Sequence, residues 1–454
     1  MKIQRIFLSP FALPIIFFAL CIMAGASLLV HSVTLDGKEL NFLDAVFTAT
    51  SATCVTGLVV VDTGSFFSRY GQTIILVLMQ IGGLGVMTFT SLGFYLLTKR
   101  VSLTDRLAVS QSLLHEPTFH LGRFLGQIVL AAFGIEIIGA ICLFAIDPQT
   151  FHPFSAIFHT VSAFCNAGFS LFPDSLMAWQ DNLAVNGIFM ALIILGGLGF
   201  FVLLDLAGKR WIQLGNNGKN QTRSLTWQSR IVLVTTAWLI VCGALVFFLA
   251  EHWTSNANRD VGAQFLTALF QSVTSRTAGF NTVDIGSMTN ISLVFLCLLM
   301  WIGGSPGSCA GGIKTTTFRA MLSFSWSQIR GRKQTVVSGF ALDRGTMQKV
   351  LALVIVSSLV LALATLVLVI TEGGAVSHLE SRGRFLEILF EVISAFGTVG
   401  LSTGLTASLS SPGKAVVILL MFVGRLGPIL FIALLQDVQK KESFAWPEKT
   451  ILVG

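Results

Sequence analysis

The chain has 454 residues, of which 54% are hydrophobic and only 11% are charged, and its mean hydropathy is +0.80. Soluble domains carry about 25% charged residues, so this composition excludes an ordinary water-soluble protein and predicts a polytopic membrane protein. The formal net charge of +7 is better explained by loops between membrane spans than by an anionic partner. The seven cysteines form no C-x-x-C pair, which argues against a disulfide framework or a zinc site.

Eight apolar segments are long enough to cross a bilayer, because about 20 apolar residues span its hydrocarbon core. They are 6–31, 71–98, 122–146, 183–207, 229–250, 290–318, 346–371 and 413–436. The first is longer than the apolar core of a signal peptide, so we expect it to remain in the protein as a helix. Four shorter apolar segments of about 11 residues are typical of re-entrant helices. They are 41–52, 153–163, 263–274 and 384–395.

Each short segment leads into a turn that ends in glycine, at Gly57, Gly168, Gly279 and Gly400. The first three glycines are 111 residues apart, and 121 residues separate the third from the fourth. The preceding side chains share no chemistry. Three positions before the glycine, the four copies have Cys54, Cys165, Arg276 and Gly397. The shared feature is therefore the backbone, to which glycine gives dihedrals that are closed to other residues.

A ring of backbone carbonyls can replace the water shell of a potassium ion. We therefore predict that the four turns together form a potassium filter. Its candidate residues are Thr53, Cys54, Val55, Thr56, Gly57; Phe164, Cys165, Asn166, Ala167, Gly168; Ser275, Arg276, Thr277, Ala278, Gly279; and Phe396, Gly397, Thr398, Val399, Gly400. Potassium would bind to their carbonyls, and the side chains of Cys54, Phe164, Ser275 and Phe396 would pack behind them.

A second glycine mark lies in the long segment that follows each turn, at 82–85, 196–199, 303–304 and 424–427. Small residues allow helix backbones to approach closely in lipid. The repeating unit is thus a long helix, a pore loop and a second long helix. The four units are repeat A at 1–98, repeat B at 122–207, repeat C at 229–318 and repeat D at 346–436, followed by a tail at 437–454.

Two spans in each unit return the chain to the same side of the membrane. The repeats are therefore parallel, around an axis along the membrane normal, whereas inverted repeats need an odd number of spans. The predicted fold is all-α, with four parallel repeats around a pseudo-fourfold pore. Most Lys and Arg residues fall in the segments on one side, which predicts cytoplasmic termini, including the tail, and turns that face outward.

The sixth long segment is interrupted by five glycines and a proline within ten residues, which makes a continuous helix improbable. Irregular backbone at membrane depth must be buried in protein or line a water-filled cavity. We predict a flexible gate under the filter. Its residues are Gly303, Gly304, Ser305, Pro306, Gly307, Ser308, Cys309, Ala310, Gly311 and Gly312. The alternative is a plain kinked helix.

Arg425 lies near the middle of the last span, where a charge costs at least about 2.5–3.5 kcal/mol to insert. We expect it to face the pore, contact the gate and raise the barrier for cations. The alternative is a structural tie to a helix carbonyl or to Glu136 or Asp205. Glu391 and His159 occupy equivalent positions in two of the short helices, and we interpret both as structural.

These turns resemble those of the KtrB/TrkH/HKT superfamily of potassium transporters, over nearly the whole chain, and the KtrB branch is the most similar. The strings that carry the resemblance are TSATCVTGL at 50–58, SAFCNAGFS at 162–170, RTAGFN at 276–281 and SAFGTVGL at 394–401. The resemblance implies a multi-pass protein of the bacterial cell membrane that acts as a homodimer. It also implies a cytoplasmic KtrA-like ring of RCK type that binds nucleotide and gates flux, and stimulation by sodium. No cofactor is expected in this chain.

Two other functions compete with a potassium-translocating subunit. A proton-coupled transporter of another cation or solute would need an intramembrane acidic relay, for which only Glu136 and Asp205 are candidates. An intramembrane enzyme would need paired aspartates, a metal-binding histidine pattern or a nucleophile site, and the sequence offers none of these. We therefore expect no enzyme and no nucleic-acid partner.

Overall fold

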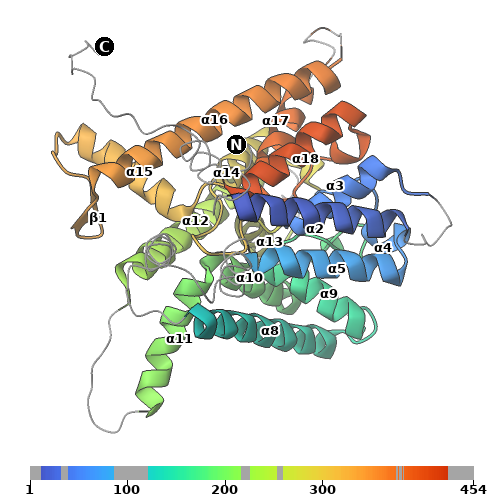
Figure 1. Ribbon diagram of the computed structural model, residues 1–454, viewed down its shortest axis with the longest axis horizontal. Coiled ribbons are helices and arrows are strands. Elements are labelled where there is room, and N and C mark those ends of the chain that lie inside the picture. Colours follow the sequence, from blue (N-terminus) through green and yellow to red (C-terminus); the bar gives the residue numbers. More distant parts are fainter. Residues whose placement is uncertain are drawn as a thin grey trace, which may run out of the picture.

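The computed structural model describes residues 12–31, 39–85, 121–215, 225–252, 259–374, 377, 381 and 383–427. This part of the chain is helical apart from its loops and one two-stranded hairpin (Figure 1). The predicted tail at 437–454 and the ends of the predicted segments 71–98 and 413–436 lie outside the described residues.

The elements follow the order of the four predicted units. The first unit contains α2 (Ala12–Val30), α3 (Phe42–Thr53), α4 (Thr63–Phe66) and α5 (Arg69–Gly83). The second contains α8 (Leu121–Ile146), α9 (Pro153–Phe164), η1 (Met177–Trp179), α10 (Leu183–Leu198) and α11 (Phe200–Gly215). The third contains α12 (Trp227–His252), α13 (Val261–Thr274), η2 (Ile285–Ser287), α14 (Asn290–Trp301) and α15 (Thr315–Ile329). The fourth contains α16 (Arg344–Glu372), α17 (Arg384–Gly397), η3 (Thr406–Ser408) and α18 (Ser411–Leu426).

The four short helices α3, α9, α13 and α17 match the short apolar segments to within about two residues at each end. Three of them begin at a polar residue whose side chain accepts a backbone N–H of the first turn. These residues are Asn41, His152 and Asp260. Such caps satisfy N–H groups that have no partner inside the helix. Each short helix becomes almost fully buried toward its C-terminal end, which leads directly into its glycine turn.

Each short helix also packs against the second long helix of the unit before it. Helix α9 packs against α5, α13 against α10, and α17 against α14. Helix α3 of the first unit packs against α18 of the last. The contacts between units therefore form a closed ring. The C-terminal ends of all four short helices are buried by neighbouring units.

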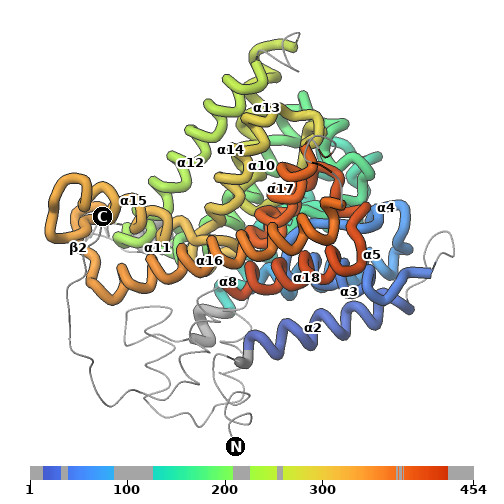
Figure 2. The backbone as a smooth tube through the Cα atoms, turned by 90° about the horizontal axis from the view of Figure 1, so that it is seen from above, coloured from blue at the N-terminus to red at the C-terminus, as the bar shows by residue number. Residues whose placement is uncertain are grey.

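Three described helices are long and apolar enough to span a membrane, namely α12, α16 and residues 126–146 of α8. At most 44% of the apolar window in any of them is buried in protein. Their outward faces carry Leu, Ile, Val and Phe, including Ile138, Val241 and Leu363, as expected for contact with lipid. Helices α16 and α8 lie along opposite edges of the molecule in Figure 1, and α2 lies on the outside in Figure 2. Helix α10 and residues 200–207 of α11 meet the same criterion only when taken together as one bent span, and Pro14–Val30 and α14 are shorter apolar helices.

A small hairpin between α15 and α16 was not anticipated from the sequence. Strands β1 (Val336–Val337) and β2 (Phe340–Ala341) are antiparallel and are joined by Ser338 and Gly339, which have φ values of 48° and 92°. Two positive φ angles are the mark of a tight hairpin turn. The indole of Trp227 donates a hydrogen bond to the carbonyl of Val337 at 3.0 Å, which ties the hairpin to α12.

Candidate functional site

The four glycine turns, defined as residues 54–57, 165–168, 276–279 and 397–400, share one backbone conformation. The glycine has a positive φ in every turn: 94° at Gly57, 70° at Gly168, 77° at Gly279 and 90° at Gly400. So does the residue two positions earlier: 56° at Val55, 59° at Asn166, 76° at Thr277 and 50° at Thr398. Positive φ is uncommon in residues other than glycine. Its recurrence at equivalent positions, in unrelated side chains, means that the surrounding structure imposes it.

Hydrogen bonds to the ends of the short helices hold the turns in this conformation. The N–H of the residue before the glycine donates to a carbonyl five positions back in three turns, from Thr56, Ala167 and Val399, at 2.7 to 2.8 Å. In the third turn the same bond runs from Ala278 to Thr274, four positions back, at 2.9 Å. The N–H groups of the turns therefore point back into the protein, which leaves the carbonyls free to face elsewhere.

Buried hydroxyl groups reinforce the same turns, and sequence reasoning did not single them out. Ser51 and Ser394 accept the N–H of Gly57 and Gly400 at 3.1 and 3.2 Å. In the other two turns a hydroxyl donates instead to a carbonyl just past the glycine. Ser162 donates to Phe169 at 2.7 Å, and Thr274 donates to Phe280 at 2.5 Å. In three of the four copies, a serine six residues before the glycine could have indicated these supports from the sequence.

The structure brings the four turns together in cyclic order. A methyl group placed on Gly57 would lie 2.6 Å from the carbonyl oxygen of Ala167 in the second turn. A methyl on Gly168 would lie 2.9 Å from that of Ala278, and one on Gly279 would lie 2.6 Å from that of Val399. A methyl on Gly400 would collide with the carbonyl of Thr56, back in the first turn. Each glycine is therefore fixed by the backbone of the next turn as well as by its own φ.

The second glycine mark explains why the turns fit so closely against the long helices. A methyl on Gly82, Gly196 or Gly424 would collide with a backbone carbonyl of a short-helix end. The three carbonyls belong to Thr53, Phe164 and Phe396, each four residues before the glycine of its turn. In the third unit a methyl on Gly303 collides instead with the carbonyl of Gly311, within the same irregular loop.

The fourth unit and the first two share a further feature, since the last glycine of each mark has a positive φ. The values are 86° at Gly85, 88° at Gly199 and 81° at Gly427.

The sequence predicted one helix over 183–207, and this prediction is wrong at Gly199. Helix α10 ends at Leu198 and α11 begins at Phe200, with a bend of 101°. The N–H of Phe200 donates to the carbonyl of Gly307 at 3.1 Å, so the 302–314 loop occupies the bend.

The interrupted segment 302–314 contains all ten predicted gate residues and separates α14 from α15. It is attached to the end of α10, because Ser305 and Cys309 donate their N–H groups to Gly197 and Gly196 at 3.1 and 3.2 Å. On its other side, a methyl on Gly311 would collide with the side chain of Thr398 in the fourth turn. The segment therefore lies against both α10 and the fourth glycine turn.

Arg425 meets this segment, as the sequence predicted. Its guanidinium donates to the carbonyl of Cys309 in the segment and to the carbonyl of Gly82 at the end of α5. Lys314 adds a second cation there and donates to the carbonyl of Ala310 at 2.6 Å. Both side chains thus contact the same irregular backbone.

The two acidic residues that the sequence offered as alternative partners of Arg425 bind other groups. Glu136 accepts the side-chain amide of Gln80 at 3.1 Å, and Asp205 accepts the N–H and hydroxyl of Thr226 at 3.0 Å. Arg425 donates to one carbonyl of the interrupted segment and to one carbonyl of helix α5, so the predicted contact with the segment and the alternative of a tie to a helix carbonyl are both observed.

Glu391 and His159 support the chain that leaves two of the turns. Glu391 is fully buried and accepts the hydroxyls of Ser402, at 2.9 Å, and Thr406. His159 is also fully buried and contacts the hydroxyl of Ser170 at 3.2 Å. Both side chains link a short helix to the residues just past its glycine turn, which agrees with the structural interpretation.

Comparison with known proteins gives concordant results. A family profile described as a cation transport protein, TrkH, matches residues 13–443. The Ktr system potassium uptake protein B of Bacillus subtilis is 38% identical, over 99% of this chain and 97% of its own length. The potassium/sodium uptake protein NtpJ of Enterococcus hirae is 35% identical, over 96% and 95%. The crystal structure of the potassium transporter TrkH from Vibrio parahaemolyticus has the same fold, with a TM-score of 0.73 at 20% identity, and the match covers 94% of this chain and 84% of that one.

Proposed function

Since this chain belongs to the TrkH family of cation transport proteins, we propose that it takes up potassium across the bacterial cell membrane, through a filter built from the backbone of the four glycine turns. The relatives named above support potassium as the substrate, because their names describe potassium uptake or potassium and sodium uptake. Potassium is the cargo, and it leaves the protein chemically unchanged.

The cyclic contact of the four glycines is the observation that carries the proposal. Four unrelated side-chain sets adopt one backbone conformation, and each glycine abuts the carbonyl that precedes the next glycine. Carbonyl oxygens gathered around one axis can replace the hydration shell of a potassium ion. The C-terminal ends of α3, α9, α13 and α17 all lead into these turns, and a helix C-terminus carries partial negative charge that favours a cation.

The pseudo-fourfold pore, the domain limits and the orientation belong to the same proposal. The packing of each short helix against the preceding unit supports four like-oriented repeats around one axis. The distribution of Lys and Arg supports cytoplasmic termini and outward-facing turns. In this orientation, the 302–314 segment lies on the inner side of the filter.

We assign the gate to the 302–314 segment and Arg425. The segment bonds to the end of α10 and abuts the fourth turn, and Arg425 holds it against α5. A loop held by a few hydrogen bonds can move without unfolding the helices on either side. Opening requires these hydrogen bonds to break. The partner subunit would control flux by favouring or disfavouring them.

The proposed assembly also rests on the family resemblance. We propose a homodimer in which each protomer has its own pore, and a cytoplasmic KtrA-like ring that binds nucleotide and controls flux, with stimulation by sodium. The support is the resemblance of the turns together with relatives whose names place them in a Ktr system. Co-purification of the chain with a separately encoded cytoplasmic ring tests the partner directly.

Growth of a potassium-uptake-deficient bacterium at low potassium tests the function. Cells that express this chain with its ring subunit should grow, and purified protein in liposomes should take up rubidium in preference to sodium. A proton-coupled transporter of another solute would instead support neither growth nor rubidium uptake. Rubidium uptake that requires a proton gradient would also contradict a pore.

A further inference from the structure

A cavity of about 260 Å³ lies beside α13, and its lining includes no residue of the four glycine turns. Its walls come from α12, α13 and the loops that contain η1 and η2, so it lies between the second and third units. It is at the end of the molecule where α12 stops and α13 starts, which is the outer face in the proposed orientation. The cavity has no role in the permeation path described above.

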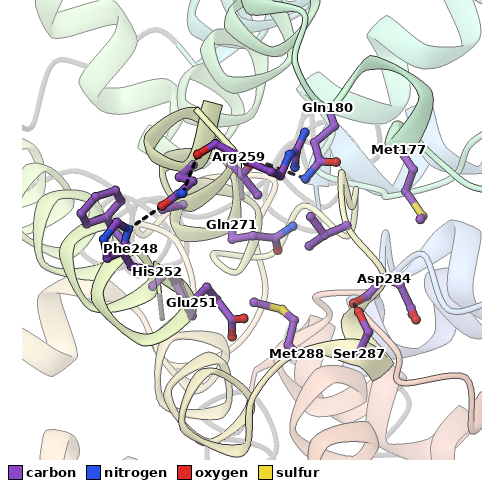
Figure 3. Close-up of a pocket in the computed structure, with 15 residues that line it drawn as sticks. Met177, Gln180, Phe248, Glu251, His252, Arg259, Gln271, Asp284, Ser287 and Met288 are labelled. Carbon is purple, nitrogen blue, oxygen red and sulfur yellow. Dashed lines mark hydrogen bonds between the residues drawn. The ribbon is translucent and has the colours of Figure 1, made fainter. Parts of the chain in front are cut away.

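One buried side chain in this cavity has no hydrogen-bond partner. Gln271 of α13 is only 1% exposed, and both its amide nitrogen and its amide oxygen are unpaired among the described residues. Figure 3 shows its side chain between Gln180, Glu251 and Asp284. A buried amide without partners costs about 1–3 kcal/mol. This amide is therefore placed for a polar occupant.

The charge around the cavity is negative. Asp284, His252 and Glu251 line it, and the carboxylate of Glu251 accepts hydrogen bonds from Thr289 and Ser292. The single lining arginine, Arg259, is paired with Asp181 at 2.5 Å. A cationic occupant is favoured over an anionic one in such a field. The described residues contain no group of three or more His, Cys, Asp or Glu that could hold a metal ion. The charge is therefore suited to a cation other than a tightly coordinated metal.

The remaining wall is apolar and polarisable. Phe247, Phe248, Met177 and Met288 line the cavity beside the polar groups. Aromatic faces attract ammonium groups, particularly those that carry carbon substituents, and thioethers adapt to irregular shapes. The carbon substituents of an alkylammonium group can also pack against these four side chains, which a hydrated inorganic cation cannot do.

From the unpaired amide, the negative field and the apolar wall together, we propose that the cavity binds an alkylammonium group, with Gln271 as its polar anchor. The group is the shared chemistry of two sources, free small amines in the medium and the ammonium headgroups of outer-leaflet lipids. The occupant would contact α13 one helical turn before the third glycine turn, since Ser275 donates its N–H to the carbonyl of Gln271 at 3.1 Å. Only the outward orientation of the cavity rests on the proposed function.

The first experiment measures binding to the full-length purified protein by the shift of its thermal unfolding midpoint. Choline and ethanolamine are the probes, in a detergent without ammonium headgroups and in saturating potassium, so that the filter is occupied. The matched neutral probe is 3,3-dimethyl-1-butanol, which has the shape of choline without its charge. We expect saturable stabilisation by choline and none by the neutral probe. Equal stabilisation by both probes, or by neither, overturns the proposal.

Substitutions locate the site. Gln271→Leu should weaken choline binding at least tenfold, because it removes both polar atoms at nearly constant volume. Asp284→Asn should weaken it several-fold, and this exposed residue keeps its bond to the N–H of Gly286. Ser357→Ala is the control, because Ser357 is also buried and has no hydrogen-bond partner within the described part of the chain, but lies in α16, outside the cavity. If neither cavity variant weakens binding, the assignment to this cavity is wrong.

Lipid nanodiscs then distinguish the two sources. Choline is titrated into protein in discs of phosphatidylethanolamine and in discs of phosphatidylglycerol. Weaker apparent choline binding in phosphatidylethanolamine identifies the headgroup as the occupant, whereas equal binding identifies a free amine. These assays do not measure transport, so failure of the binding proposal and failure of the transport proposal are separable.

Discussion

The four glycine turns and the 302–314 segment are both irregular backbone inside a helical bundle, but they are held in different ways. The turns repeat one conformation and are fixed by backbone hydrogen bonds and by each other. Among the described residues, the 302–314 segment has no counterpart in another unit. Its ends are joined by backbone bonds from Gly303 to Ile313 and from Thr315 to Gly304, and it is attached to its surroundings by the end of α10 and by Arg425. The difference supports the two proposed roles, a rigid filter made by the turns and a gate made by the segment, whose attachment to α10 and Arg425 consists of a few bonds.

The largest effect is expected where a turn meets a long helix. Gly196→Ala places a methyl group against the carbonyl of Phe164, and the backbone there has no space to move. Overpacking of this kind costs about 1–3 kcal/mol or more, so little folded protein should accumulate in the membrane. Gly187→Ala in the same helix meets open space and should stabilise the helix by about 0.5–1 kcal/mol. Normal accumulation and unfolding temperature of Gly196→Ala would show that the turns tolerate displacement.

The next prediction concerns selectivity. Gly279→Ser adds a side chain at a φ of 77°, next to the carbonyl of Val399, so it should distort the third and fourth turns together. We expect discrimination against sodium to fall at least about tenfold, equivalent to roughly 1.4 kcal/mol, in rubidium and sodium uptake by liposomes. Gly404→Ala is the matched control, because Gly404 also has a positive φ, of 101°, but has open space around it. Unchanged selectivity in Gly279→Ser would show that the third turn is not part of the filter.

The 302–314 segment should behave in the opposite way, because its proposed role is to obstruct flux and not to select ions. Deletion of residues 305–310 removes the bonds to Gly196 and Gly197 and the carbonyl that Arg425 contacts. Potassium uptake should rise several-fold at unchanged selectivity, measured per inserted protein. An unaltered or lower rate with normal membrane insertion would reject the gate.

Arg425→Ala should give a smaller change in the same direction. It frees the segment on one side and removes a positive charge from the path, so transport should be faster than in the unmodified protein. The carbonyls of Cys309 and Gly82 lose their donor, which should lower stability by about 1–3 kcal/mol. Lower stability without faster transport would assign the arginine to structure alone.

The sequence predicted those parts of the fold that depend on local pattern. The four short helices, the glycine turns and the contact of Arg425 with the interrupted segment follow from apolar period, glycine spacing and the cost of a buried charge. The break at Gly199 was missed because it depends on a hydrogen bond from Phe200 to Gly307, which is distant in sequence. The hydroxyl supports at Ser51 and Ser162 were missed for a similar reason, since serine is common in helices and only the fold shows its partner.

The position of the permeating ion tests the account most directly. A structure of the protein in thallium or rubidium, with anomalous scattering recorded, should place the ion among the four turns, next to the carbonyls of Thr56, Ala167, Ala278 and Val399. An ion that binds away from the four turns, or contacts only one or two of them while the rest face protein, would contradict a filter made by all four.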